Sequence, residues 1–243
     1  MSRHLAIVPA LNEAGSIART VAEIHEHAAG FDVLVVDDGS VDDTAAIAAA
    51  AGARVISLPF NVGIGGAVQC GYLYARDNGY QVAVQVDGDG QHDARDIPRL
   101  LAALEAQPPV EMITGSRFLG DGVGYRSSRV RRAGIRVFAG LISLLTHQRV
   151  TDATSGFRMS ARRGIELFAR DYPHDYPEVE AILMLHAHRL HSREVAVTMR
   201  PRTSGRSTIG RAMPAYYMLK VLLAVLVGLL RARPAVEVEE RRR

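Results

Sequence analysis

The fold is decided by the stretch Val82-Ala83-Val84-Gln85-Val86-Asp87-Gly88-Asp89-Gly90-Gln91, in which an apolar run ends in two carboxylates and an amide at alternate positions. The apolar run is typical of a buried strand, and the glycines that follow let the backbone approach a ligand closely. Three oxygen-bearing side chains can hold a hard divalent cation such as Mg²⁺ or Mn²⁺, and Mg²⁺ keeps coordination positions open for substrate phosphate. The stretch therefore points to a cation bound together with a diphosphate. Taken alone, it is equally typical of an acidic turn between a strand and a helix.

Strand and helix patterns alternate along the chain before this stretch. We expect strands over residues 5–9, 33–36, 54–58 and 82–86. Helical patterns run over residues 14–28, from an N-cap at Ser40 to Gly52, and over residues 65–78 behind a glycine-rich loop. The order β-α-β-α-β-α-β predicts an α/β fold, in which a mainly parallel sheet is covered by helices and binds ligands beyond the carboxyl ends of its strands.

A polar cluster follows each of the four expected strands. These clusters are Pro9-Ala10-Leu11-Asn12-Glu13, Asp37-Asp38-Gly39-Ser40, Asn61-Val62-Gly63-Ile64-Gly65-Gly66 and Asp87-Gly88-Asp89-Gly90-Gln91. Each could be an ordinary turn or helix cap, but four of them at one edge of a sheet are better explained by a ligand site. The glycine-rich loop departs from the dinucleotide fingerprint, because Val68 stands where the third glycine would fall and the loop follows the third strand. A nicotinamide-dependent enzyme is thereby disfavoured.

Length and charge set the outer limits. A chain of 243 residues with 48% hydrophobic residues is most simply one domain. The sole cysteine, Cys70, fits a reducing compartment, and the N-terminus lacks a signal-peptide pattern, so we expect a cytoplasmic protein. Residues 1–115 carry 6 Arg and 15 Asp or Glu, whereas residues 116–243 carry 23 Arg or Lys and 11 Asp or Glu. The acidic half suits metal-bridged phosphate, and the basic half suits an anionic acceptor, an anionic membrane surface or nucleic acid.

Six motifs follow one another from residue 5 to about residue 210. They are Val8-Pro9-Ala10-Leu11-Asn12-Glu13, Val35-Val36-Asp37-Asp38-Gly39-Ser40, Asn61-Val62-Gly63, Asp87-Gly88-Asp89-Gly90-Gln91-His92, Gly115-Ser116-Arg117-Phe118 and Ser155-Gly156-Phe157-Arg158. In this order they resemble the motifs of family 2 glycosyltransferases of GT-A fold, and among them those of the polyprenyl-phosphate (dolichyl-phosphate) mannosyl- and glucosyltransferase branch. The chain departs from that branch at Gly90-Gln91-His92-Asp93, where the branch commonly has Leu-Gln-His-Pro.

The resemblance implies a Rossmann-like domain that binds a nucleotide-diphosphate sugar, and it assigns residues to that task. The set implied to bind the donor is Pro9, Asn12, Glu13, Asp37, Asp38, Gly63, Asp87 and Gly88. Within the motif after the fourth strand, Asp87, Asp89 and Gln91 would hold Mg²⁺ or Mn²⁺ on the donor diphosphate. The residues implied to be catalytic are Asp89, Arg117 and Arg131, with Arg117 in contact with donor or acceptor phosphate.

The second half of the chain carries the expected acceptor site. A hydroxyl acceptor must lose a proton to a positioned base, whereas a phosphomonoester with a second pKa of about 6 is already anionic and needs only cations that orient it. Arginines beside the amphipathic stretch 135–145 and in a lid segment that begins near residue 200 could supply these cations, although each could equally be a solvated surface residue. The predicted acceptor-phosphate set is Arg117, Arg131, Arg132, Arg202 and Arg206.

We therefore expect an inverting, metal-dependent hexosyltransferase with a donor of GDP-mannose or UDP-glucose type and a polyprenyl phosphate acceptor, working at the cytoplasmic membrane face without a nucleic acid partner. Two alternatives stay open. The acceptor could be a glycan or small-molecule hydroxyl with Glu178 or Glu180 as the base, or the chain could be a catalytically silent partner in a membrane complex.

The C-terminal part has an apolar run over residues 214–230, which is shorter than the ~20 residues of a membrane span. The run is typical of an interfacial or docking helix, or of a buried helix of the domain itself. We expect a catalytic domain over residues 1–212, an apolar helix over residues 213–233 and a tail over residues 234–243. The helix and nearby arginines would hold the protein peripherally at the inner face of the plasma membrane, against anionic lipid or a small membrane protein.

Overall fold

The computed structural model describes residues 3–119, 129–174 and 177–201, and for residues 129–136 and 138 it describes the backbone without the side chains. The strands are β1 (His4–Ala10), β2 (Phe31–Asp37), β3 (Arg54–Ser57), β4 (Val82–Gln85), β5 (Met112–Ser116), β6 (Arg158–Ala161) and β7 (Ser192–Ala196). The helices are α1 (Ile17–His27), α2 (Thr44–Ala50), α3 (Gly63–Asp77), α4 (Ile97–Glu105), α5 (Arg129–Thr146), α6 (Arg162–Arg170) and α7 (Pro177–Ala187), together with a short 3-10 helix, η1 (Ala94–Asp96).

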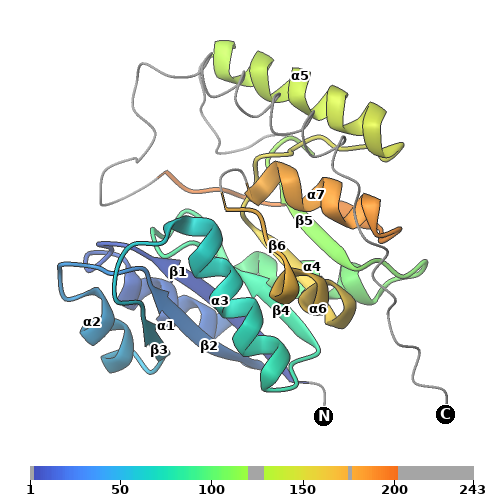
Figure 1. The fold of residues 1–243 in the computed structure, drawn as a ribbon. Helices are drawn as coiled ribbons and strands as arrows, with labels where there is room; N and C mark the ends of the chain where they lie inside the picture. The colour runs from blue at the N-terminus through green and yellow to red at the C-terminus, as the bar shows by residue number, and fades with distance from the viewer. Residues whose placement is uncertain (1–2, 120–128, 175–176, 202–243) are drawn as a thin grey trace, which may run out of the picture.

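These strands form one sheet in the order β3-β2-β1-β4-β6-β5-β7 (Figure 1). Neighbouring strands are parallel except at β6, which runs antiparallel to both β4 and β5. The order reverses at β1, which lies between β2 and β4. Ligands of open α/β sheets bind at such a switch point, beyond the carboxyl ends of the strands. The fold thus brings the ends of β1, β2 and β4 to the place where a site is expected.

The strands predicted in the first half are confirmed, each to within one or two residues at its ends. Helix α1 begins at Ile17 rather than residue 14, and α3 begins at Gly63, so the glycine-rich loop is the first turn of that helix. The predicted N-cap at Ser40 is wrong, because α2 begins at Thr44. The hydroxyl of Ser40 instead accepts a hydrogen bond from the backbone N–H of Asn12 at 2.9 Å.

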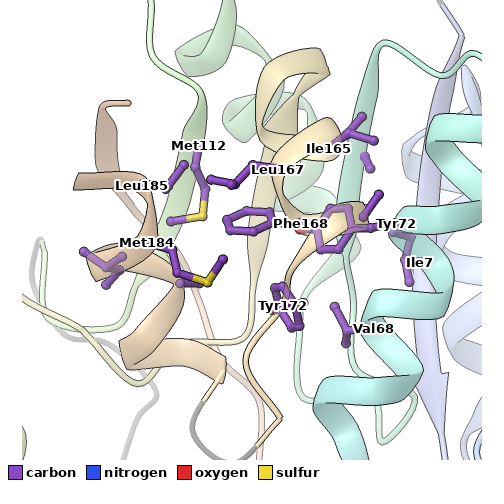
Figure 2. Close-up of a cluster of buried hydrophobic side chains, with 14 of the residues drawn as sticks. Ile7, Val68, Tyr72, Met112, Ile165, Leu167, Phe168, Tyr172, Met184 and Leu185 are labelled. Carbon is purple, nitrogen blue, oxygen red and sulfur yellow. The ribbon is translucent and has the colours of Figure 1, made fainter. Parts of the chain in front are cut away.

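Helices cover both faces of the sheet (Figure 1). One apolar cluster joins α1, α2 and α4 to the sheet, and the other joins α3, α6 and α7 to its opposite face. Figure 2 shows the rings of Tyr72, Phe168 and Tyr172 within the second cluster, where their centroids lie 5.2 to 5.5 Å apart. Aromatic pairs at this spacing stabilise a core beyond their buried area, so the helices hold the sheet from both sides.

No helix within residues 3–119, 129–174 and 177–201 is long and apolar enough to span a bilayer. The apolar run 214–230, the tail after it and the domain boundaries expected at residues 212 and 233 lie outside the described residues.

Substitution of Gly71 by Ala should destabilise the protein, because the added Cβ on α3 would lie 2.2 Å from Cγ2 of the buried Ile7 on β1. Overpacking of this kind costs about 1–3 kcal/mol of unfolding free energy. The control is Gly140→Ala in α5, where a Cβ meets nothing within 4 Å and a better helix former should stabilise by up to about 1 kcal/mol. Chemical denaturation of both variants measures the difference, and equal effects would contradict the close contact between α3 and β1.

Candidate active site

The loops after β1 and β2 are joined by hydrogen bonds between the first two polar clusters. Asn12 has a left-handed backbone with φ of 55°, and its Oδ1 accepts from the N–H of Val41 at 2.9 Å. The N–H of Glu13 donates to Oγ1 of Thr44 at 2.8 Å, and the carboxylate of Glu13 accepts from Ser16 at 2.9 Å. The two clusters therefore form one surface at the carboxyl edge of the sheet, as their positions after neighbouring strands predict.

The third cluster is tied to this surface by Asp38. Its Oδ1 accepts from the N–H of Val62 at 2.8 Å and its Oδ2 accepts from the N–H of Gly63 at 3.0 Å, so the carboxylate lies at the N-terminus of α3. The positive end of the helix dipole stabilises a carboxylate there. At Gly39, φ is 74° and a Cβ would lie 2.8 Å from the backbone of Phe60, so only glycine lets the two loops approach this closely.

The fourth cluster lies at the end of β4, against β1. The N–H of Gly88 donates to the carbonyl of Pro9 at 3.3 Å, and a Cβ on Gly88 would lie 3.1 Å from that oxygen. Gly156, in the loop before β6, has its Cβ position 3.4 Å from Oδ1 of Asp87. Gly88 thus lets the end of β4 approach β1 closely, and Gly156 lets the loop before β6 approach the carboxylate of Asp87 by its backbone alone.

All four polar clusters meet where the sequence predicts them. Within the cation motif, each of the three expected ligand residues has a different environment. Asp89 is buried, and its Oδ1 accepts from the N–H of Gln91 at 2.9 Å. The side-chain amide of Gln91 reaches the carbonyl of Arg200 at 3.5 Å. Asp87 is the more exposed carboxylate, with 34% of its side chain accessible.

The donor set at this position fits a cation that is bound with a diphosphate. Within the described ranges, no three His, Cys, Asp or Glu side chains gather as a metal-binding group. Two carboxylates and one amide make an incomplete set of hard oxygen ligands, which suits Mg²⁺ or Mn²⁺ when phosphate and water complete the coordination. Asp87, Asp89 and Gln91 are the residues that would hold the ion.

Arg117 forms a buried ion pair that the sequence did not reveal. Its Nε and Nη2 each lie 2.6 Å from an oxygen of Asp152, and Nη2 also lies 2.6 Å from Oγ1 of Thr154. Glu194 on β7 accepts from the backbone N–H groups of Thr151 and Asp152, and so holds the loop in which Asp152 stands. Bidentate, charge-assisted pairs of this kind have a fixed geometry. The expected contact of Arg117 with phosphate stays a prediction.

A second buried arginine, Arg158, connects β6 to the start of α7. It donates to the carbonyl of Ser155 at 2.8 Å and to the carbonyl of Glu178. Burial raises the pKa of the Glu178 carboxyl, the charge of Arg158 lowers it, and the charge of Asp87 raises it further. Glu178 is half-buried at the start of α7, and its raised pKa makes it a candidate general base.

The turn after the cation motif is anchored by Arg200. Its guanidinium lies 2.7 Å from Glu23 on α1 and 2.9 Å from Asp93, while its backbone N–H donates to the carbonyl of Gln91 at 2.9 Å. Hydrogen bonds from Arg95, together with the charges of Arg200 and Arg95, lower the pKa of Asp93 to about 2. The turn is thus held between α1 and the strand-like segment near residue 199.

The remaining predicted phosphate ligands are placed only in part. Arg131 and Arg132 lie in α5, where the structure describes the backbone, whereas Arg202 and Arg206 lie outside the described residues. The sequence singles out Arg158 within a motif and places Arg200 in the expected lid segment, but it reveals neither the partners of these two arginines nor the neighbours Asp152 and Glu194. Their partners stand 20 to 177 positions away, so no local spacing could have shown them.

The sheet order and the carboxylates at its switch point define the GT-A class of nucleotide-diphospho-sugar transferases. The glycosyl transferase family 2 model matches residues 5–168, and the chain belongs to this family. It is 33% identical over 168 residues to the undecaprenyl-phosphate mannosyltransferase of Micrococcus luteus, a match that covers 64% of this chain and 65% of that protein. It is 31% identical over 171 residues to the polyprenol monophosphomannose synthase of Mycolicibacterium smegmatis, covering 68% of this chain and 63% of the relative. The matched segment thus spans slightly less than two thirds of each relative.

The fold is also found in a solved structure. Glucosyl-3-phosphoglycerate synthase from Mycobacterium tuberculosis, in complex with Mn²⁺, uridine diphosphate and glucosyl-3-phosphoglycerate, aligns with a TM-score of 0.69 at 21% identity, over 93% of this chain and 80% of that chain. The predicted GT-A fold and the predicted family are both confirmed.

Asp152→Asn should destabilise the protein by about 3 kcal/mol or more, because it leaves the buried guanidinium of Arg117 without its counter-charge. Glu166→Gln, which breaks the exposed pair with Arg162 on α6, is the control and should change the unfolding free energy by less than about 1 kcal/mol. Urea denaturation measures both variants. Equal, small changes of unfolding free energy in the two variants would show that the buried charge of Arg117 is not stabilised by Asp152.

Proposed function

We propose that the protein transfers a hexose from a nucleotide-diphosphate sugar to a polyprenyl phosphate, with inversion at the anomeric carbon. The observation that carries this proposal is the pair Asp87 and Asp89 at the switch point of the sheet, beside the loops that Asp38 joins. The proposal is supported by the matched relatives, whose names are those of an undecaprenyl-phosphate mannosyltransferase and a polyprenol monophosphomannose synthase. A mannose donor is therefore the first to test, with a glucose donor second.

The residues divide the reaction between donor and acceptor. Pro9, Asn12, Glu13, Asp37 and Asp38 line the donor side, and Asp87, Asp89 and Gln91 hold the cation. A bound divalent cation stabilises the charge that develops on the leaving diphosphate. On the acceptor side, arginines orient a phosphate that is already anionic, since its second pKa is about 6. No side chain then has to remove a proton from the nucleophile.

The acceptor also supports a place for the protein at a membrane. A long isoprenoid chain confines its phosphate to the headgroup layer, so the site must work at the bilayer surface. The basic composition of residues 116–243 and the apolar run 214–230 favour peripheral binding to the anionic inner face of the plasma membrane, directly or through a small membrane protein. We assign catalysis to residues 1–212 and attachment to residues 213–233, with a tail after them.

Glu178 favours a second candidate function, transfer to a hydroxyl group. Burial raises the pKa of the Glu178 carboxyl, and the negative charge of Asp87 also raises it. A carboxyl group with a raised pKa near a cation site is a candidate general base. Glu180, two residues further on α7, is the other acidic residue of this first turn.

Asp89→Asn should reduce hexose transfer by several orders of magnitude and leave the fold intact, because a neutral amide lacks the negative charge with which a carboxylate binds a divalent cation. The assay supplies GDP-mannose or UDP-glucose, a polyprenyl phosphate and Mn²⁺, and follows radiolabelled glycolipid. The matched control is Asp43→Asn, an exposed carboxyl at the start of α2, which should keep full activity. Unchanged transfer by the Asp89 variant would contradict the cation site, and no transfer by the wild-type chain with any donor would favour the silent-partner role.

Glu178→Gln separates the two acceptor chemistries. The backbone contact of Arg158 with residue 178 does not involve the replaced carboxyl group, so the variant should fold. With a phosphate acceptor it should keep most of the wild-type kcat, because no proton is removed by the protein. A loss of ~100-fold or more, as expected when a general base is deleted, would favour a hydroxyl acceptor, and Glu180→Gln is tested in parallel.

A further inference from the structure

His92 follows the cation motif, and its ring is held in a single position behind that motif. The side chain has 0% exposure. Its Nδ1 accepts a hydrogen bond from the backbone N–H of Asp87 at 3.0 Å. The ring of Phe157 stacks on it at an interplanar angle of 12°, with 4.7 Å between the ring centroids. One edge and one face of the imidazole are therefore fixed.

The contact at Nδ1 decides which ring nitrogen carries the proton. A nitrogen that accepts from an N–H group has no proton of its own, so the neutral ring of His92 carries its proton on Nε2. This Nε2 is buried and has no hydrogen-bond partner. A buried donor without a partner is costly, and in native proteins such a group calls for a functional explanation.

The group that Nε2 approaches is the carboxylate of Asp87, with 3.6 Å between Nε2 and Oδ2. This separation is slightly longer than a hydrogen bond, and a small rotation of the carboxylate would close it. The other oxygen, Oδ1, accepts from the amide of Gln85 at 3.3 Å. Two uncharged donors thus stand at the two oxygens of Asp87.

We propose that His92 is a positioning residue for the cation site: its Nε2–H donates to Oδ2 of Asp87 when that carboxylate binds the ion. The inference rests on the proposed function, because it gives Asp87 the role of a metal ligand. A neutral donor orients the carboxylate and leaves its negative charge to the cation, whereas an arginine at the same place would compete with the ion. Hydrogen bonds to ligating side chains are worth about 10–100-fold in metal affinity.

The simpler role for His92 is to fill space beside Phe157, and two substitutions distinguish the roles. His92→Asn places an amide oxygen where Nδ1 stands, so it can accept from the N–H of Asp87 but cannot reach the carboxylate. His92→Gln places an amide nitrogen near the position of Nε2 and can restore the donor. Both side chains lose the aromatic ring, so a role in packing alone would be lost equally in the two variants.

The experiment titrates the full chain with Mn²⁺ in the presence of UDP and, in a parallel series, of GDP, and measures free Mn²⁺ by electron paramagnetic resonance. The Kd of Mn²⁺ should rise at least about 10-fold in His92→Asn and should return to within about 3-fold of the wild-type value in His92→Gln. The control for stability is Tyr72→Phe, which removes the buried hydrogen bond of 3.1 Å to Ser160. It should lower the melting temperature and leave the Kd unchanged.

Equal weakening in the two His92 variants, or unchanged binding in His92→Asn, would overturn the positioning role. If the wild-type chain fails to bind Mn²⁺ in the presence of UDP and also in the presence of GDP, the result contradicts the cation site of the proposed function, and this inference with it. A second measurement needs no variant to fold. In a chain labelled with ¹⁵N-histidine, the Nε2 proton of His92 should shift downfield when Mg²⁺ and UDP are added, and an unshifted signal in a chain that binds Mn²⁺ would contradict the proposal.

Discussion

The carboxylate of Asp38 holds the donor side of the site together, and the surrounding loops depend on it. The two carboxylate oxygens accept from the backbone N–H groups of Val62 and Gly63, and the backbone N–H of Asp38 donates to the carbonyl of Ala10 at 2.9 Å. One buried residue therefore joins the ends of β1 and β2 to the first turn of α3. A buried carboxylate is tolerated only when such hydrogen bonds and the helix dipole compensate for its lost hydration. The same contacts set the distance between the loops that would receive the nucleotide.

Arginines join other segments around the site, as Asp38 joins the loops of the donor side. Arg117 binds Asp152, Arg158 reaches the first turn of α7, and Arg200 joins Glu23 on α1 to the turn after β4. A guanidinium group presents several donors in one plane, so it can connect segments that no strand or helix connects. Because the pair of Arg117 and Asp152 is withdrawn from water, removing one partner leaves a charge that the interior cannot hydrate. The loops around Asp87 are thus fixed before any ligand arrives.

The first half of the fold and the position of the site follow from the sequence, because each strand and helix there shows its own period and each polar cluster follows a strand. The contacts within the site do not follow from it. Ser40 is a residue type that commonly caps helices. Its hydroxyl instead accepts a hydrogen bond from the backbone N–H of Asn12, because β1 and β2 are neighbours in the sheet. Asp152 was not visible as a site residue, because its partner is 35 positions away. His92 belongs to the motif after the fourth strand, but its proposed role depends on the tautomer that the fold imposes. Local patterns predict elements, whereas these contacts arise only when distant elements meet.

Pairing within the protein also changes the meaning of its charge distribution. Residues 116–243 carry 23 basic and 11 acidic residues, which suggests a strong field for an anionic acceptor. Yet Arg117 and Arg200 are bound to carboxylates, and Arg158 is bound to backbone carbonyls inside the protein. A guanidinium whose donors are already engaged offers an incoming phosphate fewer hydrogen bonds and a partly neutralised charge. We therefore expect acceptor phosphate to depend more on the arginines of α5, which lies against α7, than on Arg117, Arg158 and Arg200 (Figure 1). The basic half would then have two separate tasks, since Arg117, Arg158 and Arg200 hold the loops of the site and the arginines of α5 are the ones expected to attract the acceptor.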